Sequence, residues 1–334
     1  MKYKPLGRSG LIVSELCLGT MIFGEDSARG TDEPTAMRMI HQFLDAGGNF
    51  IDTADVYADG RSEEIVRKAL EDKRDRVVLA TKVRFSRGQD PNDVGLSRRH
   101  VIAGCEASLR RLGTDYVDLL YAHMWDPLTP IEETLRAFDD LLTAGKVRYI
   151  GVSNFKAWQV MKSLAVSDAY GWARFIAAQY QYSLVVRDIE REFVSLFEAE
   201  GLGLVTWGPL GGGFLSGKYR PGDRPTEGRI ATTPDHTEEA WQRRATERNW
   251  AILDVVGKIA EARGKTYPQV ALAWLRAQPT VVAPIIGART PEQLADNLGS
   301  IGWELTAEEL DRLDVVSAIE EGYPYRMIRE YGAR

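Results

Sequence analysis

Polar side chains that could move a proton occur where three short apolar runs end. Asp52 and Tyr57 follow one run, Lys82 ends the next, and His123 follows the run after that. A Lys beside a Tyr stabilises the phenolate and can lower the phenol pKa from about 10, and an Asp paired with that Lys keeps the ammonium in place. A neutral His beside them can donate a hydrogen bond to a carbonyl oxygen. Together these residues predict a proton donor for an oxygen that is gaining charge.

The elements that must position these residues follow a regular alternation. Runs rich in Val, Ile, Leu and Ala, as expected for strands buried on both faces, cover Leu16–Thr20, Asn49–Thr53, Val77–Lys82, Val117–Ala122, Val147–Val152, Phe175–Tyr180, Gly203–Trp207 and Val281–Ile286. Amphipathic stretches typical of helices cover Pro34–Ala46, Glu63–Lys73, Arg98–Leu112, Pro130–Ala144, Ala157–Ser167, Glu190–Glu200 and Pro268–Ala277. The first seven strands recur roughly every thirty residues, which is the size of a βαβ unit.

This alternation predicts a single (β/α)8 barrel, an α/β fold, over residues 1–334, with a doubly wound open sheet and an appended domain as the alternative. In such a barrel the active site lies at the C-terminal ends of the strands, so the four polar residues are expected on one rim. Two helix starts carry cap signals. Thr129 is expected to cap a helix with Glu132 completing a capping box, and Thr290 is expected to do the same with Gln293.

Three segments lie outside the eightfold alternation. Residues 2–14 predict a hairpin that turns between Gly7 and Gly10 and plugs the barrel bottom. The Gly/Pro-rich stretch 211–237 predicts a long loop that folds over a cofactor, followed by a helical segment over 238–263. Residues 306–334 predict a last helix, Glu308–Ala318, and a tail rich in Tyr and Arg.

Composition excludes several classes of protein. The 334 residues are 44% hydrophobic and 27% charged, typical of a globular chain with ample core. With 42 Lys and Arg against 48 Asp and Glu, the net charge of -6 argues against nucleic-acid and anionic-membrane partners. Cys17 and Cys105 are too few for a disulfide framework, and the start lacks a signal peptide, so we expect a cytoplasmic protein. No metal-ligand cluster is evident, and His41, His100 and His236 are expected at the surface.

Several motifs occur in order at the predicted strand ends. They are Leu18-Gly-Thr20, Asn49-Phe-Ile-Asp52-Thr-Ala-Asp-Val-Tyr57, Ala80-Thr-Lys82, Asp118-Leu-Leu-Tyr-Ala-His123 and Gly145-Lys-Val-Arg-Tyr-Ile-Gly-Val-Ser-Asn154. Over about residues 3 to 318 the chain resembles the aldo-keto reductase superfamily. The resemblance implies an NAD(P)H-dependent carbonyl reductase with a catalytic tetrad. In it Tyr57 is the general acid, Lys82 tunes Tyr57, Asp52 supports Lys82, and His123 orients the carbonyl of a small aldehyde, ketone or alcohol.

The resemblance also implies a dinucleotide site. An aromatic at Trp207 would stack on the nicotinamide, and Arg289 offers a fork for a 2′-phosphate, which favours NADP(H) while leaving NAD(H) possible. Gly287 and Gln293 stand where some relatives carry Lys and Arg, so this preference rests mostly on Arg289. The full set of expected cofactor contacts is Thr20, Asp52, Ser153, Asn154, Gln179, Trp207, Pro209, Leu210, Lys218, Gly287, Arg289, Gln293 and Asn297. Met21, Phe23 and Trp125 are expected to line the substrate pocket.

A rival function comes from the same superfamily. Gly95-Leu-Ser-Arg-Arg-His100 and Leu215-Ser-Gly-Lys-Tyr219 resemble its long-loop branch, which includes β subunits of voltage-gated potassium channels as well as bacterial reductases. Those subunits keep the nucleotide site while serving a membrane partner, but they carry Asn where this chain has His123. The His favours real turnover, so a regulatory nucleotide-binding subunit is the alternative. The sequence indicates no oligomeric state.

Overall fold

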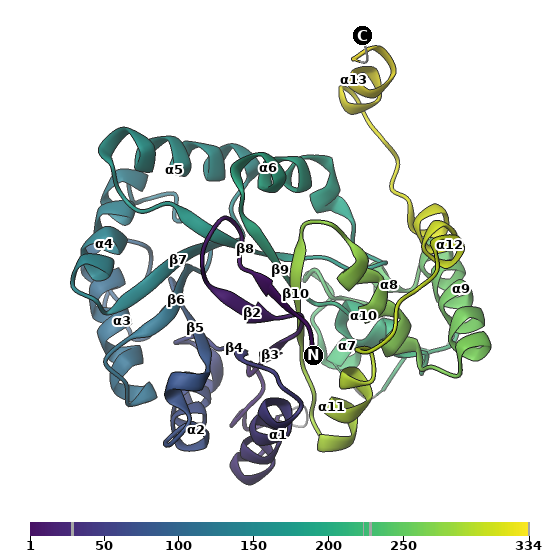
Figure 1. Cartoon of the computed structure of the whole chain (residues 1–334), viewed down its shortest axis with the longest axis horizontal. Helices are drawn as coiled ribbons and strands as arrows, with labels where there is room; N and C mark the ends of the chain where they lie inside the picture. The colour runs from purple at the N-terminus through teal and green to yellow at the C-terminus, as the bar shows by residue number, and fades with distance from the viewer. Residues whose placement is uncertain (28–29, 223, 227–228, 333–334) are drawn as a thin grey trace.

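Eight parallel strands form a closed barrel, and helices surround it (Figure 1). The computed structural model describes residues 1–27, 30–222, 224–226 and 229–332. The strands pair in the order β10-β3-β4-β5-β6-β7-β8-β9. Their bounds are β3 (Cys17–Gly19), β4 (Phe50–Asp52), β5 (Val78–Val83), β6 (Val117–Ala122), β7 (Val147–Ser153), β8 (Phe175–Gln181), β9 (Gly203–Trp207) and β10 (Val281–Ile286). The predicted (β/α)8 barrel is confirmed.

The eight predicted runs match these strands to within two residues at either end. The barrel helices also follow the predicted pattern: α1 (Glu33–Asp45), α2 (Arg61–Ala69), α3 (Arg98–Leu112), α4 (Ile131–Thr143), α5 (Ala157–Tyr170), α6 (Phe193–Glu200), α10 (Tyr267–Ala277) and α11 (Pro291–Leu298). Periodicity works here because each strand is buried on both faces while each helix buries only one.

Two predicted capping boxes are wrong in detail. At α4 the N-cap is Pro130, and no side chain caps the helix. Thr129 instead donates its hydroxyl to Asp126 Oδ2 at 2.6 Å. At α11 Thr290 does accept from the Gln293 amide, but the Gln293 side chain accepts from Arg289 N at 2.9 Å, one residue before the cap.

The N-terminal hairpin closes the barrel at the end where the strands begin. It consists of β1 (Tyr3–Pro5) and β2 (Ile12–Ser14), paired antiparallel. Leu6 and Val13 pack with barrel-lining residues, including Phe50 and Tyr121, in a small interior cluster. Gly7, at φ +60°, fits so closely that a Cβ there would lie 2.3 Å from the Ile176 carbonyl oxygen. A larger core cluster fills the layer between the strands and the helices.

The remaining helices flank β9 and β10 or follow the barrel. They are α7 (Arg229–Thr232), α8 (Trp241–Arg244), α9 (Glu247–Arg263), α12 (Ala307–Ser317) and α13 (Tyr325–Tyr331). The long helix α9 begins at Glu247, so the predicted start at 238 is wrong. Figure 1 shows α13 standing apart from the barrel at the C-terminal end. Within the described residues no helix is long and apolar enough to cross a membrane.

Candidate active site

Lys82 lies at the centre of the predicted rim and connects two of the other polar residues. It is near the end of β5, and its side chain is fully buried. Its ammonium donates to Asp52 Oδ2 at 2.5 Å, to the Thr53 carbonyl oxygen at 2.9 Å and to the Tyr57 hydroxyl at 3.0 Å. Since an ammonium has three protons to donate, this arrangement uses its full capacity.

The charges of Lys82 and Asp52 determine which side chains of this cluster are protonated at neutral pH. Burial lowers the pKa of Lys82, but the adjacent Asp52 and Tyr57 raise it by a larger amount. The pKa of Lys82 therefore lies above its ordinary value. Burial raises the pKa of Asp52, and Lys82 and Gln179 oppose that rise. Lys82 therefore remains an ammonium at neutral pH, and its charge favours the ionised form of the phenol beside it.

Tyr57 is presented by a tight turn over Tyr57–Gly60 that follows β4. Ala58 and Asp59 adopt left-handed backbone angles, with φ of 46° and 57°, which side-chain-bearing residues seldom adopt. Below the turn, Thr20 shares a hydrogen bond of 2.7 Å with Ser62, whose hydroxyl is also 3.1 Å from Thr53. A buried hydroxyl chain thus supports the segment between Asp52 and Tyr57.

His123 lies beside Tyr57 and is held as a neutral ring. The two ring centroids are 6.1 Å apart in an edge-on arrangement. Burial, the Lys82 ammonium and the Arg84 guanidinium together lower the pKa of His123 well below its ordinary range. A neutral imidazole has one N–H group that can donate a hydrogen bond to an uncharged oxygen. The proton that this oxygen takes up can then come from another group.

The residues expected around the nicotinamide lie at the ends of β7, β8 and β9. Asn154, at φ 55°, donates through Nδ2 to the His123 carbonyl oxygen and to Ser153 Oγ, both at 3.0 Å. Gln179 donates to Asp52 Oδ1 at 2.7 Å, which ties β8 to the Asp52–Lys82 pair. Trp207 is partly exposed at the end of β9, and Pro209 and Leu210 follow it in the next loop.

Two of the residues expected around the phosphates, Lys218 and Arg289, are cations that lie near each other. Lys218 and Arg289 are both exposed, and the Arg289 charge contributes, after burial, to lowering the pKa of Lys218. Among the described residues neither cation forms an ion pair. An anion placed between them would relieve their repulsion, which is the fit expected for a phosphate group.

The other predicted contacts of this region belong to the β10–α11 connection. Asn297 is buried and donates to the Gly287 carbonyl oxygen at 3.2 Å, while Gln293 is exposed. A Cβ on Gly287 would meet nothing within 4 Å. Of the predicted lid over 211–237, positions 223 and 227–228 lie outside the described residues.

The predicted substrate walls do not share one environment. Met21 and Trp125 are partly exposed, and Trp125 packs edge-on against Phe155 with centroids 5.0 Å apart. Phe23 has no exposed surface and belongs to the large core cluster. Phe23 is therefore a packing residue in this structure.

Sequence reasoning overlooked buried polar residues next to Tyr57. Glu63 is fully buried, accepts from Thr81 Oγ1 at 2.6 Å and pairs with Arg111 Nε at 2.7 Å. Asp55 is fully buried as well, and burial followed by the Glu63 charge raises the pKa of Asp55 to about 7. Their one signal was proximity to Tyr57 in the sequence. His100, expected at the surface, is also buried.

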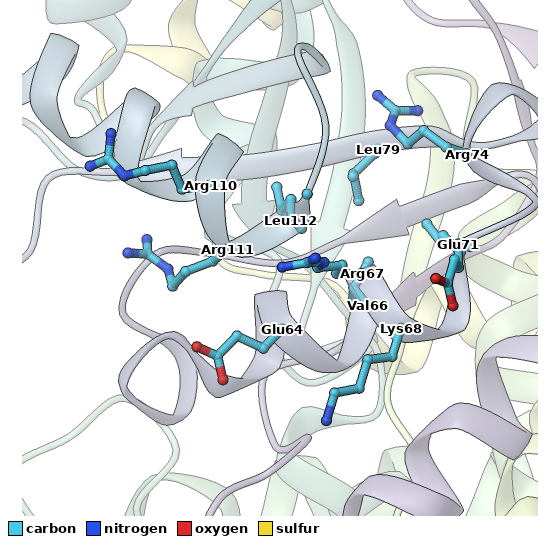
Figure 2. A pocket seen from close by; sticks show the side chains of 12 residues that line it. Glu64, Val66, Arg67, Lys68, Glu71, Arg74, Leu79, Arg110, Arg111 and Leu112 are labelled. Atoms are coloured by element: carbon cyan, nitrogen blue, oxygen red, sulfur yellow. The ribbon is translucent and has the colours of Figure 1, made fainter.

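A hollow of about 670 Å³ lies elsewhere, on the outside of the barrel (Figure 2). It is lined mainly by α2 and α3, from which Arg67, Arg110 and Arg111 project. Arg111 is paired with Glu63, and Arg74 in the same hollow is paired with Asp118. None of the strand-end residues lines this hollow, so we place the candidate active site at the Lys82 cluster, where proton-moving groups converge.

The cluster can hold a proton on Tyr57, stabilise the phenolate that remains after its transfer, and orient an oxygen with His123. Within the described residues no group of three or more His, Cys, Asp or Glu side chains could hold a metal ion.

Comparison with known proteins relates this geometry to a family. The sequence model of the aldo/keto reductase family matches residues 15–318. A probable voltage-gated potassium channel subunit beta from Oryza sativa subsp. japonica is 38% identical over 323 residues, covering 95% of this chain and 96% of the relative.

Two further relatives are named as oxidoreductases. The uncharacterized oxidoreductase YrpG of Bacillus subtilis (strain 168) is 39% identical over 326 residues, covering 94% of this chain and 95% of the relative. The versiconal hemiacetal acetate reductase of Aspergillus parasiticus is 35% identical over 353 residues, covering 96% and 99%. Similarity thus extends over nearly the full length of each pair of chains.

Proposed function

The chain belongs to the aldo/keto reductase family, and from that premise we propose that it is an NADP(H)-dependent oxidoreductase that interconverts an aldehyde or ketone and an alcohol. The observation that carries the proposal is the buried Lys82 ammonium, which donates to Asp52 at 2.5 Å and to Tyr57 at 3.0 Å. A cation so placed favours loss of the phenolic proton to an acceptor oxygen.

In the proposed mechanism Tyr57 is the general acid for reduction and the general base for oxidation. Tyr57 gives its hydroxyl proton to the carbonyl oxygen as that oxygen gains charge. Lys82 keeps its own proton and stabilises the phenolate that remains, and Asp52 holds Lys82 in place. Neutral His123 donates a hydrogen bond that orients the same oxygen. The dinucleotide, when bound, supplies or accepts the hydride.

The residues proposed to hold the dinucleotide form two groups. Around the nicotinamide we propose Thr20, Asp52, Ser153, Asn154, Gln179, Trp207, Pro209 and Leu210, and around the phosphates Lys218, Gly287, Arg289, Gln293 and Asn297. Lys218 and Arg289, which form no ion pair with the described residues, are the support for the second group. The Arg289 guanidinium is the support for NADP(H) over NAD(H). We propose Met21 and Trp125 as walls of the substrate pocket. Both cysteines are free thiols, which fits the cytoplasmic location that we propose.

A second candidate is a nucleotide-binding regulatory subunit, which the similarity to the potassium channel subunit beta of Oryza sativa subsp. japonica favours. Such a subunit would bind the dinucleotide with little or no turnover. Neutral His123 beside Tyr57 supports the enzyme instead, because a binding protein has no need of a donor aimed at a substrate oxygen.

Steady-state assays with purified protein test the two candidates. A panel of aldehydes, ketones and sugars is offered with NADPH and, separately, with NADH, and nicotinamide absorbance is followed. We expect NADPH-dependent turnover of at least one carbonyl class and slower turnover with NADH. Tight NADPH binding by fluorescence titration, without turnover of any carbonyl, would favour the regulatory subunit.

A further inference from the structure

One cation stands next to the proposed carbonyl-orienting residue. Arg84 follows Lys82 by two positions, just beyond the end of β5. Because side chains alternate along a strand, Arg84 leaves β5 on the same side as Lys82, which faces the barrel interior. The Arg84 guanidinium carbon lies 5.3 Å from the centroid of Phe85, and the Phe85 ring packs edge-on against His123 at 4.8 Å. Arg84 thus borders the mouth of the barrel beside His123.

No described acidic side chain forms an ion pair with Arg84. Asp126 is close enough for Arg84 to help lower its pKa, but the Asp126 carboxylate is already occupied. Asp126 accepts from Leu96 N at 2.8 Å, Thr129 Oγ1 at 2.6 Å and Leu128 N at 3.0 Å. Arg87, three residues after Arg84, does have a partner in Asp59. Among the described residues, no acidic side chain is therefore paired directly with the Arg84 charge.

The Arg84 side chain also has an unused donor. Its Nε is buried and has no hydrogen-bond partner among the described residues. The two terminal nitrogens of the guanidinium also donate no hydrogen bond to the described residues, so a ligand acceptor at the barrel mouth can supply the partner that they lack. Guanidinium groups match carboxylates in shape as well as in charge, because two parallel hydrogen bonds can form.

We propose that Arg84 makes the active site selective for carbonyl substrates that carry a carboxylate over neutral carbonyl compounds of the same shape. The inference rests on the proposed reductase function and adds the substrate class to it. Tyr57, Phe85 and Trp125 provide aromatic surface near the site, which suits an apolar or aromatic segment between the carbonyl and the carboxylate.

A matched pair of aldehydes tests this selectivity. 4-Carboxybenzaldehyde carries a carboxylate, and its methyl ester, methyl 4-formylbenzoate, is neutral with the same ring and the same carbonyl. We expect wild-type kcat/KM with NADPH to favour the acid by about tenfold or more, the usual size of a charge-assisted hydrogen bond. Arg84→Met should lower kcat/KM for the acid and leave kcat/KM for the ester unchanged, so the preference is lost. Arg84→Lys should keep part of the preference. Arg312→Met, an exposed arginine on α12, is the matched control and should behave as wild type.

Two kinetic outcomes would overturn the proposal. In the first, wild type reduces the acid and the ester equally well. In the second, Arg84→Met lowers kcat/KM for both by the same factor, which would indicate a structural role.

A binding measurement separates this inference from the proposed function. Calorimetric titration compares 4-(hydroxymethyl)benzoate with its methyl ester in the presence of NADP+. If no carbonyl is turned over but the acid binds about tenfold more tightly and Arg84→Met abolishes the difference, the reductase proposal fails while the carboxylate site stands. Equal affinities, or no binding of either compound, would overturn the carboxylate site.

Discussion

At the scale of single residues, the arrangement around Lys82 is the basis on which we propose Tyr57 as an acid near neutral pH. A buried ammonium is costly unless it is paired and hydrogen-bonded, and Lys82 meets both conditions through Asp52, Thr53 and Tyr57. Since the pair is held inside the barrel, its charge acts on Tyr57 through a medium that screens poorly.

Replacing Tyr57 by Phe tests this assignment directly. The substitution removes the phenolic proton and leaves the ring, so carbonyl reduction should fall by about two orders of magnitude or more. Nucleotide affinity should change little, because the phenol is not proposed to contact the phosphates. The measurement is kcat in steady state together with a fluorescence titration of NADPH. Tyr170→Phe, an exposed tyrosine at the end of α5, is the control, and near-normal turnover by Tyr57→Phe would make the assignment wrong.

At the scale of elements, function depends on the loops that follow the strands. Each strand from β3 to β8 carries at least one polar residue at or just after its C-terminal end, and the loops after β9 and β10 carry Lys218 and Arg289. A net charge of -6 means that the chain as a whole does not attract an anionic dinucleotide. We therefore propose that local cations on these two connections provide the attraction for the dinucleotide.

The β10–α11 connection carries the prediction for cofactor preference. Arg289→Ala should weaken NADP+ binding by about tenfold to a hundredfold, since a charge-assisted contact to the 2′-phosphate would be lost. NAD+, which lacks that phosphate, should bind almost as before. Dissociation constants for both nucleotides give the comparison, with Arg312→Ala as the control. Equal losses for NADP+ and NAD+ would exclude a 2′-phosphate role for Arg289.

At the scale of the whole molecule, buried charges connect distant segments. Glu15, just before β3, accepts from Lys2 N at 2.7 Å and from Arg276 Nη2 at 2.6 Å, which joins the N-terminus to α10. Glu63 and Arg111 join α2 to α3 in the same way. These pairs hold neighbouring units of the barrel in register, so removing one partner would leave an unpaired buried charge.

Unlike these ion pairs, the buried Asp55 carboxyl destabilises the folded state when it ionises. It therefore makes the free energy of unfolding depend on pH. Burial and the Glu63 charge raise its pKa to about 7 in the folded protein, against 3.8 for the ordinary carboxyl. Between these values the folded state binds the proton more tightly than the unfolded state does. The free energy of unfolding should therefore fall as pH rises from about 4 to 7 and then level off. The total loss from this group is roughly 4 kcal/mol.

Urea unfolding of Asp55→Asn between pH 5 and 8 measures this contribution. The variant cannot ionise at this position, so its stability relative to wild type should increase as pH rises from 5 to about 7 and then level off. Asp115→Asn, which changes an exposed aspartate, should follow wild type at every pH. If Asp55→Asn and wild type change in parallel, Asp55 does not titrate near neutral pH in the folded protein.

The sequence by itself determined the barrel and the membership of its polar rim. Runs buried on both faces alternate with runs buried on one, and this difference in period predicts strands and helices without any knowledge of contacts. Asp52, Tyr57, Lys82 and His123 could be found because each lies at the C-terminal end of a strand or shortly after it. Parallel strands in a barrel bring these ends to one rim.

Only the tertiary structure decided how charge is distributed around that rim. No pattern in the sequence marks Glu63 and Asp55 as buried, yet both are buried, and α3 supplies the Arg111 that pairs with Glu63. Thr129 satisfies Asp126 instead of capping α4, and Phe23 packs in the core. Each outcome depends on a distance between segments that lie far apart in the chain, and periodicity along the chain contains no information about such distances.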